Sequence, residues 1–259
     1  LYPEFDVSDW EMYALAIINE LKSRAIAAHM SDVELNVYYS RATDRQYTNL
    51  VTLRDTTSIS FMNFGLRRHE SFWWEKQACE MACEVMDARF TGISTTSLAM
   101  ELAKEAKGTN AHELIMVIMA LASVLGPEAM RLALHDVIPK WEPLFHGRLL
   151  VMLPDAYGTQ NFFDSMPKDL AEHVAHTWTA VRGDSDDMIV EGERALAFWR
   201  KWDVDVIKAR KAYMPSDSLT VPGMQAIDRH FQGIIATPCG WGTGFTHDFK
   251  GLHPRGSEQ

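Results

Sequence analysis

The feature that most restricts the fold is an alternation of short apolar stretches with longer helical patterns. The alternation repeats about every 30 residues, which is the size of one strand–helix unit. Strands joined by helices run parallel, and parallel strands build a barrel or a doubly wound sheet. The predicted strands are residues 58–64, 90–92, 109–111, 149–153, 177–181, 211–215 and 233–238. The sequence therefore predicts an α/β fold.

Helical periodicity occupies most of the intervals between these strands. Residues 31–57 are polar and mixed, which indicates weak helix and loop. The predicted helices are residues 8–29, 70–88, 94–108, 112–125, 128–138, 170–173, 187–202 and 221–231. We expect a helical lead-in segment at 1–57, an α/β core at 58–250 and a polar tail at 251–259.

Charge and composition exclude several classes of partner. The formal net charge of −10 argues against nucleic acid. Small anionic ligands are still allowed, because local arginines act within a Debye length of roughly 8–10 Å. No apolar run approaches the ~20 residues that cross a bilayer, so we expect no membrane association. The three cysteines indicate small core residues, which places the protein in a reducing cytoplasm.

Polar or charged side chains follow every predicted strand. In parallel α/β folds, ligand sites form at the carboxyl ends of the strands. The residues at these positions are Arg67, Arg68, Ser94, His112, Asp155, Arg182, Asp184 and Asp217. Their recurrence in series predicts one functional site.

Each of these residues also has a purely structural interpretation. Ser94 is predicted to cap a helix, and His112 and the aspartates are also typical of caps and turns. Arg67 and Arg68 are harder to explain in this way, because two cations at a helix start oppose the helix dipole. An anionic ligand would relieve that repulsion.

The last predicted strand runs into a loop that contains Gly240, Gly242 and Gly244. Glycine tolerates positive φ and lacks a Cβ, so such a loop can bring several N–H groups to one anion. Thr243 adds a hydroxyl donor. The motif alone is equally typical of a phosphate cradle and of an ordinary glycine turn.

Seven motifs together are similar to the nicotinate phosphoribosyltransferase family. They are FGLRR (64–68), FTGIST (90–95), GTNAHE (108–113), DAYGT (155–159), VRGDS (181–185), SDSL (216–219) and GWGTGFTHD (240–248). The resemblance implies an irregular, incomplete parallel α/β barrel preceded by a helical segment. It also implies an N-terminal domain and a C-terminal end that this sequence lacks, so we expect a piece of a longer protein that forms a homodimer.

The activity that the resemblance implies is the joining of nicotinate to 5-phosphoribosyl 1-pyrophosphate (PRPP). The products are nicotinate mononucleotide and pyrophosphate, in NAD biosynthesis and salvage. ATP hydrolysis is coupled to this step through a phosphohistidine, and Mg²⁺ accompanies PRPP and ATP. No protein-built metal site is predicted, because His173 and His176 lack a third ligand.

The resemblance also assigns roles to individual residues. His112 matches the phosphorylated histidine, and Asp155 and Asp184 match catalytic carboxylates. The substrate-binding residues that it implies are Arg67, Ser94, Arg182 and Asp217. Arg67 would pack on the pyridine ring, and a serine at position 94 would admit the carboxylate of nicotinate. The 5′-phosphate would be held by Gly240, Gly242 and Thr243.

Departures from the family pattern, together with the missing N-terminal domain, leave alternatives open. Asp186 and Ser218 stand where the family commonly has glycine. The alternatives are an inactive remnant that only binds phosphate ligands and an enzyme specific for nicotinamide.

Overall fold

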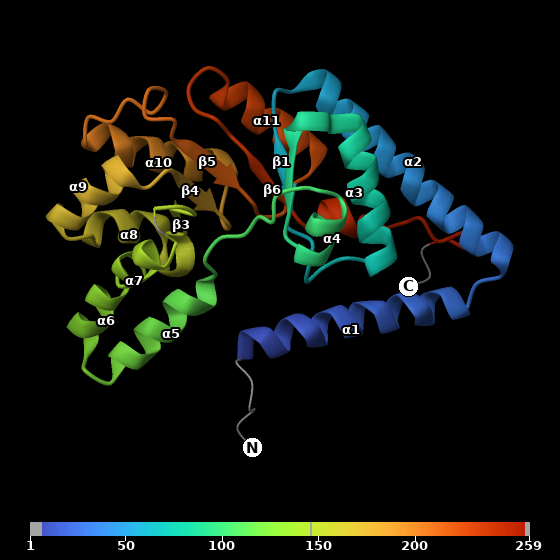
Figure 1. The fold of residues 1–259 in the computed structure, drawn as a ribbon, viewed down its shortest axis with the longest axis horizontal. Coiled ribbons are helices and arrows are strands. Elements are labelled where there is room, and N and C mark those ends of the chain that lie inside the picture. Colours follow the sequence, from blue (N-terminus) through green and yellow to red (C-terminus); the bar gives the residue numbers. More distant parts are fainter. Residues whose placement is uncertain (1–6, 146, 257–259) are drawn as a thin grey trace. The chain divides into compact units, whose positions relative to one another are not determined.

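The computed structural model describes residues 7–145 and 147–256, which form two compact units. The first unit comprises residues up to 107 with 218–226 and 239 onward, and the second comprises 108–217 and 227–238. Each unit contains one three-stranded parallel sheet, and neither sheet closes on itself (Figure 1). The predicted α/β class with parallel strands is therefore confirmed. The predicted division at residues 57 and 250 stays a prediction, because the two units reflect how the chain packs and do not show which segments form separate domains.

The sheet of the first unit has the strand order β2-β1-β6. Its strands are β1 (Phe61–Asn63), β2 (Phe90–Ile93) and β6 (Cys239–Trp241). Its helices are α1 (Val7–Ala28), α2 (Asp32–Thr56), α3 (Phe72–Met86), α4 (Thr96–Glu101) and α12 (Thr243–Thr246), with the 3-10 turn η1 (Asp87–Arg89). The Phe61 ring lies 5.2–5.3 Å from those of Phe90, Trp241 and Phe245. This aromatic contact joins all three strands to α12.

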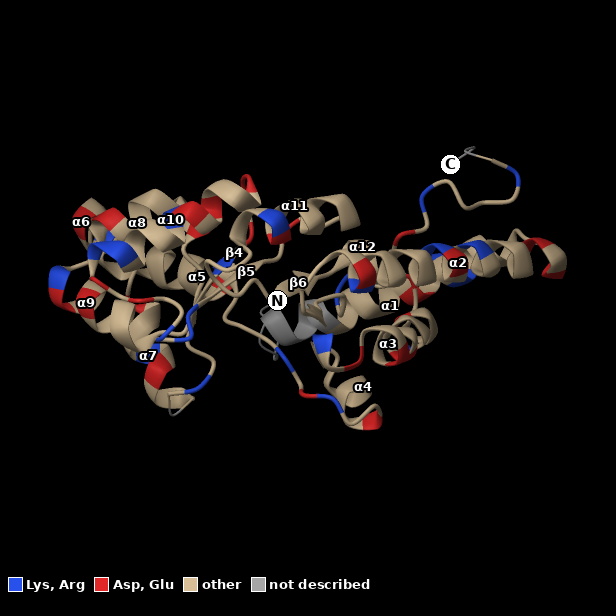
Figure 2. Cartoon of the chain, turned by 90° about the horizontal axis from the view of Figure 1, so that it is seen from above, with Lys and Arg blue, Asp and Glu red and all other residues tan. Residues whose placement is uncertain are grey.

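Helix α2 replaces the mixture of weak helix and loop that we predicted for residues 31–57. Ser31 and Glu34 form a capping box at its start. Its buried residues recur at helical spacing as Tyr38, Ala42, Gln46, Leu50 and Leu53. The prediction failed because this buried stripe includes an alanine and a glutamine. Charged residues of both signs occupy other positions along the helix (Figure 2).

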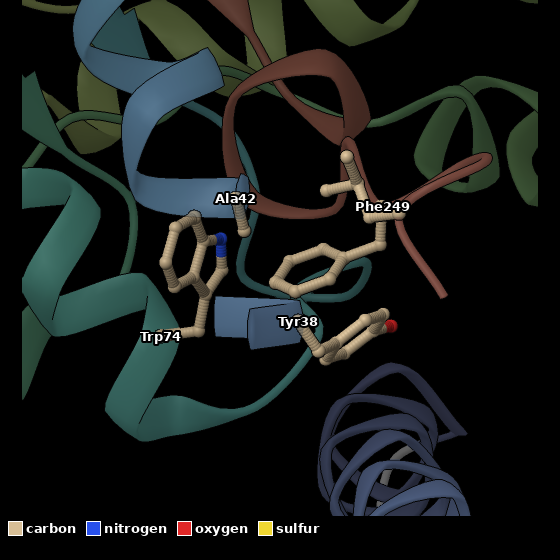
Figure 3. Close-up of a cluster of buried hydrophobic side chains, with 5 residues drawn as sticks. Tyr38, Ala42, Trp74 and Phe249 are labelled. Atoms are coloured by element: carbon tan, nitrogen blue, oxygen red, sulfur yellow. The ribbon is translucent and has the colours of Figure 1, made fainter. Parts of the chain in front are cut away.

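A cluster of buried side chains fixes α2 against α3. Phe249 lies between Tyr38 and Trp74, with ring centroids 5.0 and 4.9 Å away (Figure 3). Such aromatic pairs stabilise by about 0.5–1.5 kcal/mol each beyond the burial of their area. The segment after β6 therefore belongs to the packed core of the first unit.

The sheet of the second unit has the strand order β3-β4-β5. Its strands are β3 (Val151–Met152), β4 (Ala180–Gly183) and β5 (Ala212–Pro215). Its helices are α5 (His112–Ser123), α6 (Pro127–Ala133), α7 (Val137–Leu144), α8 (Thr159–Ser165), α9 (Lys168–Thr177) and α10 (Met188–Lys201), with the 3-10 turn η2 (Asp155–Tyr157). Helix α11 (Val221–Phe231) begins in the first unit and ends in the second.

Several predicted elements differ from the structure. Residues 109–111 form no strand, and residues 233–238 contain only a single bridge, from Ala236 to Ala212. The last strand is β6, which begins after Pro238 and includes Gly240. The predicted helix at 94–108 is the short α4, residues 128–138 are divided between α6 and α7, and α8 was not predicted. Among the described residues, no helix is long and apolar enough to span a bilayer.

Candidate functional site

A histidine held between two carboxylates forms the centre of the candidate site in the second unit. His112 is the first residue of α5, and its Nε2 lies 2.9 Å from Asp155 Oδ1. Its Nδ1 lies 3.6 Å from Asp184 Oδ2. The fold thus brings together three predicted site residues that span 72 positions of the sequence, from residue 112 to residue 184.

The sheet explains this meeting. Strands β3 and β4 are neighbours and parallel, so their carboxyl ends lie at the same edge. Asp155 opens η2 just after β3, and Asp184 directly follows β4. Ser185 Oγ donates to Asp155 Oδ2 at 2.9 Å, which fixes the second oxygen of that carboxylate.

Arg182 ties the ends of β4 and β5 to the segment before α5. Its Nη2 lies 2.8 Å from Asp184 Oδ2, and its Nη1 donates to Thr109 Oγ1 at 2.9 Å. Its Nε donates to Ser216 Oγ at 2.8 Å, and that hydroxyl lies 2.6 Å from Asp184 Oδ1. Arg182 and Asp184 are only 16% and 19% exposed, so their mutual attraction is less screened than that of a surface pair.

The cluster shifts the protonation of its members. The hydrogen bond to Asp155 raises the pKa of His112 above its usual range, although burial opposes the charged ring. Burial is the largest single influence on Asp155 and acts to raise its pKa, but the hydrogen bond and charge of His112, together with the hydrogen bonds from Ser185 and the backbone, lower the pKa overall. The pair therefore favours an imidazolium beside a carboxylate.

Asp217 follows β5 by two residues and is half-buried. Among the described residues, no hydrogen bond or ion pair joins it to the His112 cluster. Within the same ranges, no group of three or more His, Cys, Asp or Glu is placed to hold a metal ion.

The other predicted site residues all belong to the first unit, where they follow its three parallel strands, except for Gly240, which lies within β6. Ser94 follows β2, and its N–H donates to the carbonyl of Asn63 at the end of β1. Arg67 lies in the exposed turn after β1, and its carbonyl accepts from Asn19 of α1 at 3.0 Å. Since parallel strands end at one edge, these residues share that edge with the segment after β6.

Ser94 does not cap a helix, contrary to the prediction. The N-cap of α4 is Thr95, and its side chain bonds elsewhere. The buried Oγ of Ser94 has no hydrogen-bond partner within the described ranges. A buried hydroxyl without a partner costs free energy, which favours a ligand contact.

Glu75 is a buried carboxylate beside the predicted site residues that sequence reasoning missed. Its side chain is fully buried and accepts hydrogen bonds from Asn63 Nδ2 at 2.7 Å and Thr95 Oγ1 at 2.6 Å. Its second oxygen lies 2.8 Å from His69 Nδ1. One carboxylate thus joins the ends of β1 and β2 to the turn that carries Arg67. In the sequence, the polar segment FGLRRHE (64–70) between β1 and α3 was the one nearby indication of a functional site.

The glycine segment is a strand followed by a short helix, not an open loop. Gly240 pairs with Met62 inside the sheet, and Gly242 precedes the first turn of α12. A Cβ on Gly242 would lie 3.4 Å from the carbonyl oxygen of Phe64, which is an ordinary van der Waals contact. Thr243 is exposed at the start of α12, where the first N–H groups of a helix lack intrahelical partners.

The chain is similar to known proteins both in sequence and in fold. Residues 59–255 match the nicotinate phosphoribosyltransferase (NAPRTase) family. The nicotinate phosphoribosyltransferase of Porphyromonas gingivalis is similar in structure, with 25% identity and a TM-score of 0.79 over 93% of this chain and 57% of that one.

Two further solved structures share the fold. The nicotinate phosphoribosyltransferase of Vibrio cholerae has 23% identity and a TM-score of 0.79, covering 93% of this chain and 54% of that one. A putative nicotinate phosphoribosyltransferase of Saccharomyces cerevisiae has 23% identity and a TM-score of 0.71, covering 92% and 55%. The chain thus spans a little over half the length of these proteins. With a family match over three quarters of its residues, this chain belongs to the nicotinate phosphoribosyltransferase family.

Proposed function

We propose that this chain is the catalytic core of an enzyme that joins nicotinate to PRPP, in NAD biosynthesis. The observation that carries the proposal is His112 held between Asp155 and Asp184, within a chain of this family. In the reaction, the pyridine nitrogen forms a bond to C1 of the ribose. The C1–O bond breaks, and pyrophosphate leaves with the electron pair. No proton needs to move.

The carboxylates suit the charge that develops in this step. Cleavage at C1 builds positive charge on the ribose, and negative groups near it stabilise the transition state. Arg182, held by Asp184, offers donors to anionic ligand oxygens. Arg67 and the first turn of α12, with Gly242 and Thr243, are candidate contacts for the ring and for a phosphate. Gly240 contributes backbone only, since it lies within β6.

Mg²⁺ would enter with the pyrophosphate. Magnesium keeps several waters and phosphate oxygens and needs only one or two protein carboxylates. Asp217 fits that demand, because no hydrogen bond or ion pair engages its carboxylate within the described ranges. Bound there, the ion would neutralise charge on the leaving group.

We also propose that ATP phosphorylates His112. The reacting form is the neutral imidazole: once the imidazolium has lost its Nδ1 proton to solvent and Nε2–H donates to Asp155, the Nδ1 lone pair attacks the terminal phosphorus, and ADP leaves with the bond electrons. The added negative charge would alter substrate affinity, so that ATP hydrolysis is coupled through the different affinities of the two states. We expect the enzyme to act as a homodimer in the cytoplasm.

The decisive experiment incubates the protein with nicotinate, PRPP and Mg²⁺, with and without γ-labelled ATP. We expect nicotinate mononucleotide, and label on the protein that is lost in His112→Ala. His230→Ala is the matched control, because His230 also contacts a carboxylate, Glu193, outside the cluster. Product without any label on His112 would refute the phosphohistidine.

Ser94 decides between nicotinate and nicotinamide in this proposal. An aspartate at position 94 would repel the nicotinate carboxylate and accept the amide of nicotinamide. We expect Ser94→Asp to lose product with nicotinate and to gain it with nicotinamide. Turnover of nicotinamide but not nicotinate by the unmodified protein would refute this assignment.

A further inference from the structure

Asn110 carries a buried side-chain amide that forms no hydrogen bond within the described part of the chain. Its side chain is 3% exposed. Neither Nδ2 nor Oδ1 has a hydrogen-bond partner within residues 7–145 and 147–256. Burying polar atoms without partners costs free energy, and native structures rarely keep such groups unless they serve another purpose.

The position of Asn110 connects it to the candidate site. The preceding residue, Thr109, accepts from Arg182 Nη1, and His112 follows two residues later. Thr109 Oγ1 also lies 3.0 Å from the carbonyl oxygen of Asn110. The backbone at Asn110 is thus held between two residues of the cluster, while its side chain makes no bond of its own.

A second buried asparagine shows what a structural role looks like in this chain. Asn63 is fully buried, its Nδ2 donates to Glu75 Oε1 at 2.7 Å, and its Oδ1 accepts from the N–H of Gly65 at 2.6 Å. Both ends of that amide are satisfied by the protein. Asn110 differs because both ends of its amide are left for something else.

We propose that the Asn110 amide binds the ribose hydroxyls of the phosphoribosyl substrate. This inference rests on the proposed function and adds a binding residue to the same site. A hydroxyl both donates and accepts, and a carboxamide offers one acceptor and two donor hydrogens. A pair of ribose hydroxyls therefore satisfies both Oδ1 and Nδ2.

The alternative occupants satisfy the amide less well. A phosphate or pyrophosphate presents acceptor oxygens, which would pair with Nδ2 and leave Oδ1 without a donor. The charged groups of the cluster are also one-sided, and its hydroxyls on Thr109, Ser185 and Ser216 already bond within the protein. Arg182 only donates, and the ionised carboxylates of Asp155 and Asp184 only accept. Asn110 thus supplies the group that matches a diol.

The test replaces Asn110 with leucine, which has a similar shape and no polar atoms. We expect the melting temperature to stay the same or rise, since an unpaired buried amide has been removed. Calorimetry should show binding of ribose 5-phosphate and PRPP weakened by about tenfold or more, equivalent to one or two lost hydrogen bonds. The affinity for pyrophosphate should not change. Asn110→Ala, which cannot overpack the site, should behave in the same way.

Asn63→Leu is the matched control. Its melting temperature should fall because Glu75 loses the hydrogen bond from Asn63 and the Gly65 N–H loses its acceptor. If the Asn110 variants lose as much stability as Asn63→Leu, or fail to fold, the amide is structural and the inference is wrong. Unchanged affinity for ribose 5-phosphate, or an equal loss for pyrophosphate, also overturns it. Failure of the unmodified protein to bind PRPP would instead refute the proposed function.

Discussion

Replacing Glu75 tests whether one buried carboxylate holds together the strand ends of the first unit. Glu75→Leu removes the acceptor for Asn63, Thr95 and His69, which are 0%, 6% and 3% exposed. Leaving a buried donor unsatisfied costs about 1–3 kcal/mol, and Glu75→Leu leaves three buried groups without their acceptor, which amounts to about 3 kcal/mol or more. We therefore expect the free energy of unfolding to fall by about 3 kcal/mol or more.

Glu75→Gln is the sharper comparison. The amide oxygen can still accept from Asn63 and Thr95, which share Oε1 in the structure. The amide nitrogen would face His69 Nδ1, which can accept after a change of tautomer. Only the charge is lost, so we expect a cost of about 1 kcal/mol, typical of a single hydrogen bond.

The assay is urea unfolding followed by tryptophan fluorescence, which reports on Trp74, the 2% exposed residue that directly precedes Glu75 in α3. Glu84→Leu in the same helix is the control, because Glu84 is exposed and should change stability by no more than about 0.5 kcal/mol. A loss below about 1 kcal/mol for Glu75→Leu, or equal losses for the leucine and glutamine variants, would refute the reasoning.

Two further predictions concern protonation and backbone strain. The raised pKa of His112 contributes stability that is fully present below pH 6.5 and is lost as the pH rises through the folded-state value. Asp155→Asn should move that pKa down, as NMR titration of the ring would show; an unchanged pKa contradicts the assignment. Ser218 has φ 46°, in the left-handed region. Ser218→Gly should relieve about 1 kcal/mol of strain and raise the urea midpoint, whereas a lower midpoint would be evidence against strain there. Ser216→Gly, in contrast, should lower it, because the Ser216 hydroxyl bonds Arg182.

The backbone conformation explains why the family pattern has glycine at the two positions where this chain departs from it. Asp186 and Ser218 stand where the resemblance implies glycine, and both have positive φ, at 67° and 46°. Glycine adopts this region without steric cost, and aspartate tolerates it better than most residues. Asp186 also pairs with Arg194 at 3.1 Å, which balances its extra charge.

The local sequence pattern was sufficient to predict many of the strands and helices of this protein. The apolar runs at β1, β2, β3, β4 and β5 and the periodicity of α3, α5, α10 and α11 were read from neighbouring residues alone. The placing of Asp155 and Asp184 after strands followed from the same reading, since parallel strands end at one edge, whereas His112 begins α5 after residues 109–111, which form no strand. These features depend on spacing within a short segment, which a sequence displays directly.

Other features needed the tertiary structure, because they depend on residues far apart in the chain. Gly240 lies in a strand because β6 pairs with β1, and α2 is long because α3 and Phe249 bury its small and polar residues. Glu75 reads as a surface residue of a helix, yet packing encloses it among three hydrogen-bonding partners. Sequence patterns report which side chains prefer burial; only the packed chain determines which polar groups are buried and whether each one finds a partner.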